Sequence, residues 1–300
     1  MFTGCGTAMV TPFCSDGSLD EATLRQLVHR QISAGVDFLV PCGTTGESPT
    51  LTHEEHLRVV EITVQEAQGK VPVMAGAGGY NTAEVVAMAR ELAAIGAGGI
   101  LSVTPYYNKP TQEGLYQHYR TIAQAVSLPI VVYSVQARTG INIEPATVKR
   151  LAEIENIIGI KEASGSITQM ATILNTVPEE FLVLSGDDVI TLPLIALGGR
   201  GVISVVSNEI PAEMARLTRL ALEGDFTGAR QLQRHYQPLM EVNFVESNPI
   251  PVKAALAEMD LLLPVWRLPL VAPKAENQAR IHNVLVSTGV LQRTHAAVAN

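Results

Sequence analysis

The chain is short of charged residues, and of basic residues above all. Only 17% of its 300 residues are charged, and 29 acidic residues outnumber 21 lysines and arginines. An acidic balance argues against nucleic acid or an anionic membrane surface as a partner, because both bind basic patches. No apolar run reaches the roughly 18 residues that a helix needs to cross a bilayer. Composition therefore favours a globular protein that acts on small molecules or on other proteins.

Cysteine is equally scarce. The three cysteines, Cys5, Cys14 and Cys42, are odd in number and lack the spacing of metal ligands, which favours a reducing compartment. Residues 1–10 lack the basic start of a secretory signal and already resemble a strand. We therefore expect a cytoplasmic protein. Hydrophobic residues make up 47% of the chain, enough for a sizeable core in one large α/β domain or two average ones.

Short apolar runs recur along the chain with helical patterns between them. They occupy residues 6–10, 37–41, 71–75, 99–103, 129–133, 157–161, 181–185 and 201–206. Their spacing, about 20 to 34 residues, is that of successive βα units. Thr52 and Glu55 have capping-box spacing at the start of one intervening helix, and Asn81 is an N-cap candidate for the next.

Eight βα units predict a (β/α)₈ TIM barrel, with an open doubly wound sheet as the alternative. Polar residues follow most of the strands, as they do at the catalytic mouth of such barrels. The open sheet lacks its phosphate turn, because Gly76 and Gly78 are followed by Asn81 in place of the third glycine. Helical periodicity dominates from residue 211 onward. We expect a catalytic barrel over residues 1–225 and a C-terminal helical appendage over 226–300, frayed at residues 294–300.

Lys161 is the most informative residue. It closes the apolar run 157–161, and it alone among six lysines ends such a run. Burying an ammonium favours loss of its proton, and a neutral amine can form an imine with a carbonyl substrate. Lys161 is therefore the Schiff-base candidate. Taken alone, it is better explained as a lysine whose stem covers apolar surface at a strand end.

Other residues fit imine chemistry. The turn at residues 43–47 offers hydroxyls and backbone amides for a substrate carboxylate, although it could be a plain βα turn. Tyr106 and Tyr107 follow the fourth strand, where packing is the simpler explanation. Tyr133 ends the strand before that of Lys161 and could exchange protons with an imine. Arg138 supplies a cation suited to a second carboxylate.

Three further motifs have simpler explanations than catalysis. His53 and His56 stand three residues apart, which is not a zinc-enzyme spacing, so we expect no metal. Asp187 and Asp188 could bind Mg²⁺ in another barrel enzyme, but we expect them to cap a helix. Residues 164–166 most simply cap the following helix. A non-catalytic descendant that only binds a ligand stays open as a different class.

Together, residues 43–47, 106–110, 133–140 and 159–164 resemble the dihydrodipicolinate synthase family of pyruvate-dependent class I aldolases, over residues 4 to about 257. The family also contains N-acetylneuraminate lyase and keto-deoxy-sugar aldolases. Arg138 and the pair Thr44 and Thr45 favour the dihydrodipicolinate synthase branch. The resemblance implies condensation of pyruvate with L-aspartate 4-semialdehyde to 4-hydroxy-tetrahydrodipicolinate, in lysine and diaminopimelate biosynthesis, without a cofactor. The alternative is an aldolase acting on a sugar acid.

The resemblance also implies roles for individual residues. Lys161 forms the imine, Tyr133 is its acid-base, and Thr44 links Tyr133 to Tyr107 in a proton relay. Tyr107 reaches the site of a neighbouring subunit, which implies a dimer at least and usually a homotetramer. The substrate-binding set is Thr45 for the pyruvate carboxylate, Arg138 for the aldehyde carboxylate, and Gly186 and Ile203 along the pocket.

Two departures from the family pattern stand out. A proline usual between the tyrosine and the arginine is missing from residues 134–137, which removes a fixed φ from the loop that presents Arg138. Family members that lysine inhibits bind it beside residues that match Ser48, His53, His56, Glu84 and Tyr106 here. Tyr80 stands where those members place an asparagine, so we expect weak inhibition or none.

Overall fold

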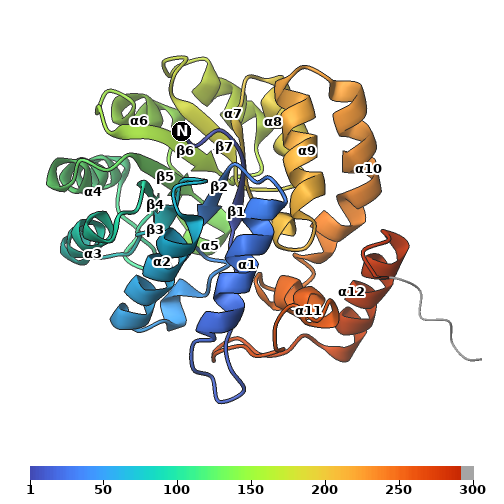
Figure 1. The fold of residues 1–300 in the computed structure, drawn as a ribbon. Helices are drawn as coiled ribbons and strands as arrows, with labels where there is room; N and C mark the ends of the chain where they lie inside the picture. Colours follow the sequence, from blue (N-terminus) through green and yellow to red (C-terminus); the bar gives the residue numbers. More distant parts are fainter. Residues whose placement is uncertain (292–300) are drawn as a thin grey trace, which may run out of the picture.

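The computed structural model describes residues 1–291 and consists of a ring of parallel strands enclosed by helices (Figure 1). The strands are β1 (Gly4–Ala8), β2 (Phe38–Val40), β3 (Met74–Gly76), β4 (Gly99–Val103), β5 (Ile130–Ser134), β6 (Ile157–Glu162), β7 (Leu182–Ser185) and β8 (Gly201–Ser204). Their order is β2-β1-β8-β7-β6-β5-β4-β3, and a parallel bridge from Leu39 to Val73 links the two ends. The predicted barrel is confirmed.

Helices alternate with the strands as the sequence predicts. They are α1 (Glu21–Ser33), α2 (His53–Ala67), α3 (Thr82–Ile95), α4 (Gln112–Ala125), α5 (Gln136–Thr139), α6 (Pro145–Leu151), α7 (Ile167–Leu174) and α8 (Thr191–Ala196), with the 3₁₀ turns η1 (Ser48–Thr50) and η2 (Val206–Asn208). The capping box of α2 forms as predicted, because Thr52 and Glu55 exchange hydrogen bonds. Asn81 caps α3 and Ser166 caps α7, also as predicted.

Strand boundaries differ from the apolar runs by a few residues. The third run begins at residue 71, yet β3 starts at Met74, because Pro72 has no N–H to donate to a ladder. Pro72 instead accepts a hydrogen bond from the N–H of Leu39 at 3.1 Å. The first strand starts two residues early, at Gly4, where it pairs with Gly201 of β8.

The last helices gather on one side of the barrel, coloured orange to red in Figure 1. They are α9 (Pro211–Leu222), α10 (Phe226–Val242), α11 (Ile250–Glu258) and α12 (Ala275–Ser287). One apolar cluster joins them to the barrel through Cys5 of β1, Val202 of β8, Met214 of α9 and Ile281 of α12. The division at residues 225 and 226 stays a proposal about chain organisation. The expectation of a frayed end at residues 294–300 falls outside the described residues.

No helix within residues 1–291 combines the length and apolar character needed to cross a membrane. The barrel interior is filled by a separate cluster that includes Phe38, Met74, Tyr133, Leu184 and Ile203. This packing closes the barrel below its carboxyl end, as in other barrels of this architecture. Side chains at the strand ends therefore stand on a rigid apolar floor.

Candidate active site

Lys161 and Tyr133 lie side by side on neighbouring strands. Tyr133 of β5 and Lys161 of β6 are register partners, and each stands one residue before the end of its strand. Lys161 Nζ lies 4.3 Å from the centroid of the Tyr133 ring. The parallel pairing thus brings together an amine and a phenol that are 28 positions apart in sequence, at the end of the barrel where such enzymes react.

Burial makes Lys161 a nucleophile. The residue is only 5% exposed, and no ion pair to it forms within residues 1–291. Desolvation lowers the pKa of the Lys161 ammonium to about 7. This net pKa includes the carboxylate of Asp188, which raises it, and the smaller effect of the Arg138 charge, which lowers it. A substantial fraction of the amine is therefore neutral near neutral pH, which imine formation requires.

Tyr133 keeps its proton at neutral pH. Burial raises the pKa of its phenol to about 12, against the opposing effects of the Arg138 charge and a hydrogen bond with Thr44. A protonated phenol next to the amine can donate a proton to the oxygen that leaves during imine formation. This arrangement supports the acid-base role of Tyr133, which stays a prediction.

The turn between β2 and η1 is held in an unusual backbone conformation. Cys42 and Glu47, at its two ends, have positive φ angles of 55° and 53°. Gly76 lies against the turn so closely that a Cβ there would stand 2.0 Å from the carbonyl oxygen of Cys42. Thr44 faces the cavity described below, whereas Thr45 is buried. Residues other than glycine rarely adopt a left-handed backbone conformation unless contacts with neighbouring residues stabilise it, so such contacts must hold this turn.

Asn248 is a functional candidate that the sequence did not indicate. Its side-chain Nδ2 donates to Thr45 Oγ1 at 2.9 Å, and its backbone carbonyl accepts from Arg138 Nη2 at 3.1 Å. Because the amide occupies a lone pair of Thr45 Oγ1, the hydroxyl hydrogen stays available to a substrate carboxylate. In the sequence Asn248 only precedes Pro249 at the start of a helix. No local pattern links it to Thr45, which is 203 positions earlier, or to Arg138, which is 110 positions earlier.

Arg138 stands on an ordered turn despite the missing proline. Residues 136–139 form the short helix α5, in which the N–H groups of Arg138 and Thr139 donate to the carbonyl of Val135. Thr104 Oγ1 donates to Thr139 Oγ1 at 3.1 Å, which ties this turn to the end of β4. Hydrogen bonds thus replace the ring that would otherwise fix φ in this loop.

Gly186 and Ile203 were expected along the pocket, and neither is among the residues that line the cavity, although Gly186 lies against Lys161. A Cβ at Gly186 would lie 3.2 Å from Lys161 Cε and 2.5 Å from the Cβ of Ala163, so a larger residue there would displace the lysine stem. Ile203 is 1% exposed and packs in the barrel interior with Tyr133. Gly186 therefore limits the space beside the lysine stem.

A cavity of about 560 Å³ lies beside this site, but Lys161, Thr45, Gly186 and Ile203 are not among the residues that line it. Thr44, Tyr133 and Arg138 line it. The residues that we associated with lysine inhibition line the same cavity, namely Ser48, His53, His56, Glu84 and Tyr106. Thr44, Tyr133 and Arg138 therefore share one opening with these five residues.

Two tyrosines of the prediction lie away from the cavity lining. Tyr107 is 91% exposed and has a positive φ of 68°. Tyr80 is 53% exposed, and its ring meets that of Tyr106 edge-on at 5.2 Å between centroids. Within one chain, Tyr107 does not reach Tyr133 or Thr44. Its role as a member of the relay stays a prediction.

The acidic pair after β7 does not cap a helix, contrary to expectation. The N-cap of α8 is Ile190, without a side-chain hydrogen bond. Asp188 Oδ2 instead accepts from the N–H groups of Val205 and Val206 at 3.1 and 2.9 Å, because these amides follow β8 directly and face inward. Burial raises the pKa of Asp188 to about 6. Asp188 acts as the anion whose charge raises the pKa of Lys161.

The two histidines of α2 have separate partners. His53 Nε2 lies 2.9 Å from Glu91, and His56 Nε2 lies 2.8 Å from the carbonyl oxygen of Gly76. Within residues 1–291, no three histidine, cysteine or acidic side chains gather as metal ligands do. These contacts account for both rings without a metal.

A neutral lysine beside a protonated tyrosine, at the carboxyl end of a (β/α)₈ barrel, defines a site for Schiff-base-forming lyase chemistry. The comparisons agree, because the model of the dihydrodipicolinate synthetase family matches residues 1–288. The chain belongs to that family.

Individual relatives match over nearly the whole chain. A 4-hydroxy-tetrahydrodipicolinate synthase of Koribacter versatilis is 53% identical over 295 residues, which are 98% of each chain. The structure of dihydrodipicolinate synthase from Aquifex aeolicus superposes with a TM-score of 0.95 at 43% identity, covering 98% of this chain and 100% of the other. The chloride-inhibited dihydrodipicolinate synthase of Acinetobacter baumannii complexed with pyruvate gives 0.96 at 40% identity, covering 97% and 100%.

The lowered pKa of Lys161 predicts the pH dependence of imine formation. The neutral amine reacts, so the rate of borohydride trapping with limiting pyruvate should fall about tenfold per pH unit below pH 7 and level off above pH 8. Asp188→Asn should move the half-maximal point to lower pH, because the carboxylate that raises this pKa is gone. A parent profile that still rises above pH 9 would contradict a lowered pKa.

Proposed function

We propose that the protein condenses pyruvate with L-aspartate 4-semialdehyde to give 4-hydroxy-tetrahydrodipicolinate, a step of lysine and diaminopimelate biosynthesis in the cytoplasm. The observation that carries the proposal is the buried amine of Lys161 beside Tyr133, since Tyr133 and Arg138 line one cavity. The name of the Koribacter versatilis relative supports the same reaction. No cofactor enters the chemistry, because the imine itself acts as the electron sink.

The reaction begins with pyruvate held by its carboxylate at the turn of residues 43–47. In this proposal the Thr45 hydroxyl, oriented by Asn248, and nearby backbone amides bind that carboxylate. Lys161 Nζ attacks the ketone carbon, and Tyr133 donates the proton that lets the oxygen leave as water. The resulting imine loses a proton from its methyl group and becomes an enamine, a carbon nucleophile.

The enamine then attacks the aldehyde carbon of the second substrate. Arg138 binds the carboxylate of that substrate as an ion pair, and its contact with the Asn248 carbonyl orients the guanidinium. The amino group of the new chain attacks the imine carbon, which closes the ring and releases Lys161. In this proposal Gly186 and Ile203 restrict the position of the Lys161 stem during each of these steps.

The proton relay needs a second chain. Thr44 and Tyr133 line the same cavity, but Tyr107 is 91% exposed in one chain. We propose that Tyr107 enters the site of a neighbouring subunit, and that the working form is a dimer or a homotetramer. An exposed tyrosine with a positive φ at the tip of a loop fits such an exchange, because a partner surface can support both features.

Trapping tests the proposed function directly. Sodium borohydride with pyruvate should inactivate the protein and add one reduced pyruvyl group to the peptide that contains Lys161. Lys253, the other fully buried lysine side chain, is the internal control and should stay unlabelled, since it is paired with Glu47. Near-full turnover by Lys161→Ala would contradict the proposal, whereas a few per cent of residual activity would not.

Arg138 distinguishes the proposed reaction from a sugar-acid aldolase. Arg138→Ala should raise KM for aspartate semialdehyde at least tenfold, since a charge-assisted contact contributes about 1.5–3 kcal/mol. KM for pyruvate should change much less. Equal effects on both substrates would assign Arg138 to the general architecture and favour N-acetylneuraminate or 2-keto-3-deoxygluconate as substrate, which the same coupled assay can compare.

Lysine should inhibit weakly or not at all. Tyr80 presents a phenol where inhibited relatives supply an amide, and a phenol lacks the amide's donor and acceptor pair. The neighbouring Asn81 is committed to α3, because it accepts from the N–H of Ala83 and donates to Glu84. Tyr80→Asn should increase sensitivity in a titration of activity against L-lysine. A steep loss of rate in the parent at sub-millimolar lysine would show that this reasoning is wrong.

A further inference from the structure

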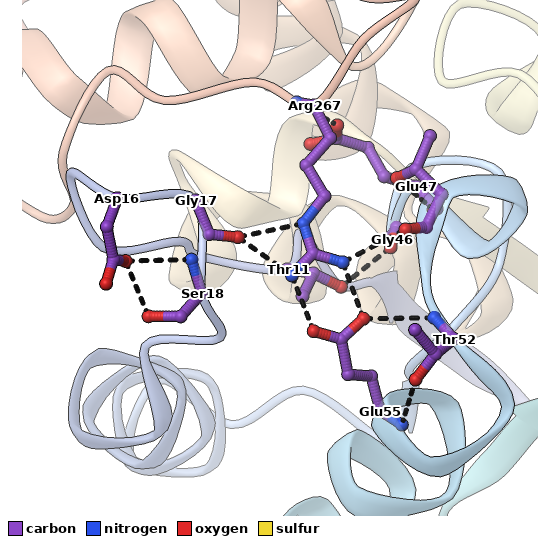
Figure 2. A network of polar contacts seen from close by, with 10 residues as sticks. Thr11, Asp16, Gly17, Ser18, Gly46, Glu47, Thr52, Glu55 and Arg267 are labelled. Atoms are coloured by element: carbon purple, nitrogen blue, oxygen red, sulfur yellow. Dashed lines mark hydrogen bonds and ion pairs between the residues drawn. The ribbon is translucent and has the colours of Figure 1, made fainter.

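We propose that the C-terminal helical region shapes the pyruvate-binding turn through a buried clamp made of Glu47, Lys253 and Arg267. In this inference, which rests on the proposed function, Lys253 is a positioning residue for pyruvate rather than a catalytic one. The geometry points to a role for α11 and the segment after it that goes beyond covering the barrel. Figure 2 shows the Arg267 side of the clamp.

The centre of the clamp is a fully buried ion pair. Lys253 Nζ of α11 lies 2.5 Å from Glu47 Oε1, and both side chains are 0% exposed. The pair therefore binds the last residue of the turn to a helix that begins about 200 positions later in the sequence. Charges at this depth are held in place by their partner, because moving either one would leave a charge unpaired in an apolar surrounding.

Arg267 extends the clamp on the outer side. Its backbone N–H donates to Glu47 Oε2 at 3.3 Å, so both carboxylate oxygens of Glu47 accept hydrogen bonds. The guanidinium pairs with both oxygens of Glu55 at 2.6 Å and donates to the carbonyls of Gly17 and Thr50 (Figure 2). Phe13 lies against both cations, with its ring centroid 4.4 Å from Lys253 Nζ and 4.2 Å from Arg267 Cζ.

Three consecutive residues of the turn are fixed from outside it. Thr45 Oγ1 accepts a hydrogen bond from the side-chain amide of Asn248. The carbonyl of Gly46 accepts from Thr11 Oγ1 at 2.7 Å. The carboxylate of Glu47 accepts from Lys253 and Arg267. The contacts to Thr45 and Glu47 come from Asn248 just before α11, Lys253 within α11 and Arg267 after it. The positive φ angles at both ends of the turn show why external support is needed.

The clamp touches the site on one side only. Lys253 and Arg267 hold Glu47, the last residue of the turn that contains the pyruvate-binding Thr45, and neither makes a hydrogen bond with Lys161 or Tyr133 within the described residues. Displacement of the turn should therefore weaken pyruvate binding while leaving the pKa of Lys161 and the aldehyde site nearly unchanged. A purely structural role would instead lower stability without this selectivity.

The test removes both charges of the pair together. Lys253→Met alone would leave Glu47 as a buried unpaired carboxylate, so the informative protein is the double variant Glu47→Gln with Lys253→Met, since methionine replaces the lysine stem. Its KM for pyruvate should rise roughly tenfold, as expected when a binding group is misplaced. KM for aspartate semialdehyde and the pH profile of borohydride trapping at saturating pyruvate should match the parent within about twofold.

Glu258→Gln supplies the matched control. Glu258 of α11 contacts Gln278 and His282 of α12, so the change perturbs the same region without touching the turn. Its KM for pyruvate should stay at the parent value. A similar rise in the control, or a parental KM in the double variant, would overturn the positioning role.

Two further measurements keep the outcomes distinct. If the double variant does not fold, Arg267→Lys keeps the buried pair but weakens the grip on Glu55, Gly17 and Thr50, and it should raise KM for pyruvate without changing KM for the aldehyde. An unchanged KM for pyruvate there would refute the clamp. Trapping of pyruvate by the parent is measured first. Failure at that step refutes the proposed function, whereas an unchanged KM in the variants refutes only the clamp.

Discussion

The site depends on the cost of burying a charged amine without a counter-ion. A protonated lysine in contact with an apolar barrel interior is unfavourable, and the protein offers Lys161 no ion pair within the described residues, only the more distant charge of Asp188. The pKa of the lysine falls to about 7 as a result. The same burial raises the pKa of Tyr133 to about 12. One physical cause thus produces both a nucleophile and a proton donor on adjacent strands.

Much of this could be predicted from the sequence, because the information is local. Each strand ends in residues that follow it directly in the chain, and parallel strands in a barrel end at the same mouth. Lys161, Tyr133, Arg138 and Gly186 were found in this way. The helix caps at Thr52, Asn81 and Ser166 also depend on neighbours three or fewer positions away.

The rest depends on contacts between distant parts of the chain. Asn248 reaches Thr45 across 203 positions, and Arg267 reaches Gly17 across 250, and no periodicity or motif connects them. Asp188 was expected to cap a helix because aspartate often does, yet it accepts from amides that follow β8, which only the closed barrel brings near. The missing proline before Arg138 led us to expect a looser loop, whereas α5 and Thr139 supply hydrogen bonds instead.

Lys253 shows why burial alone does not identify a catalytic lysine. In the sequence it appeared to be an ordinary residue of a helix, yet its side chain is as fully buried as any in the molecule. Burial lowers the pKa of Lys253 as it does that of Lys161, but the carboxylate of Glu47 at 2.5 Å opposes the shift. The difference between the two lysines is the partner, not the depth. An amine with a fixed carboxylate is a structural cation, whereas a buried amine beside a phenol and without an ion pair is free to react.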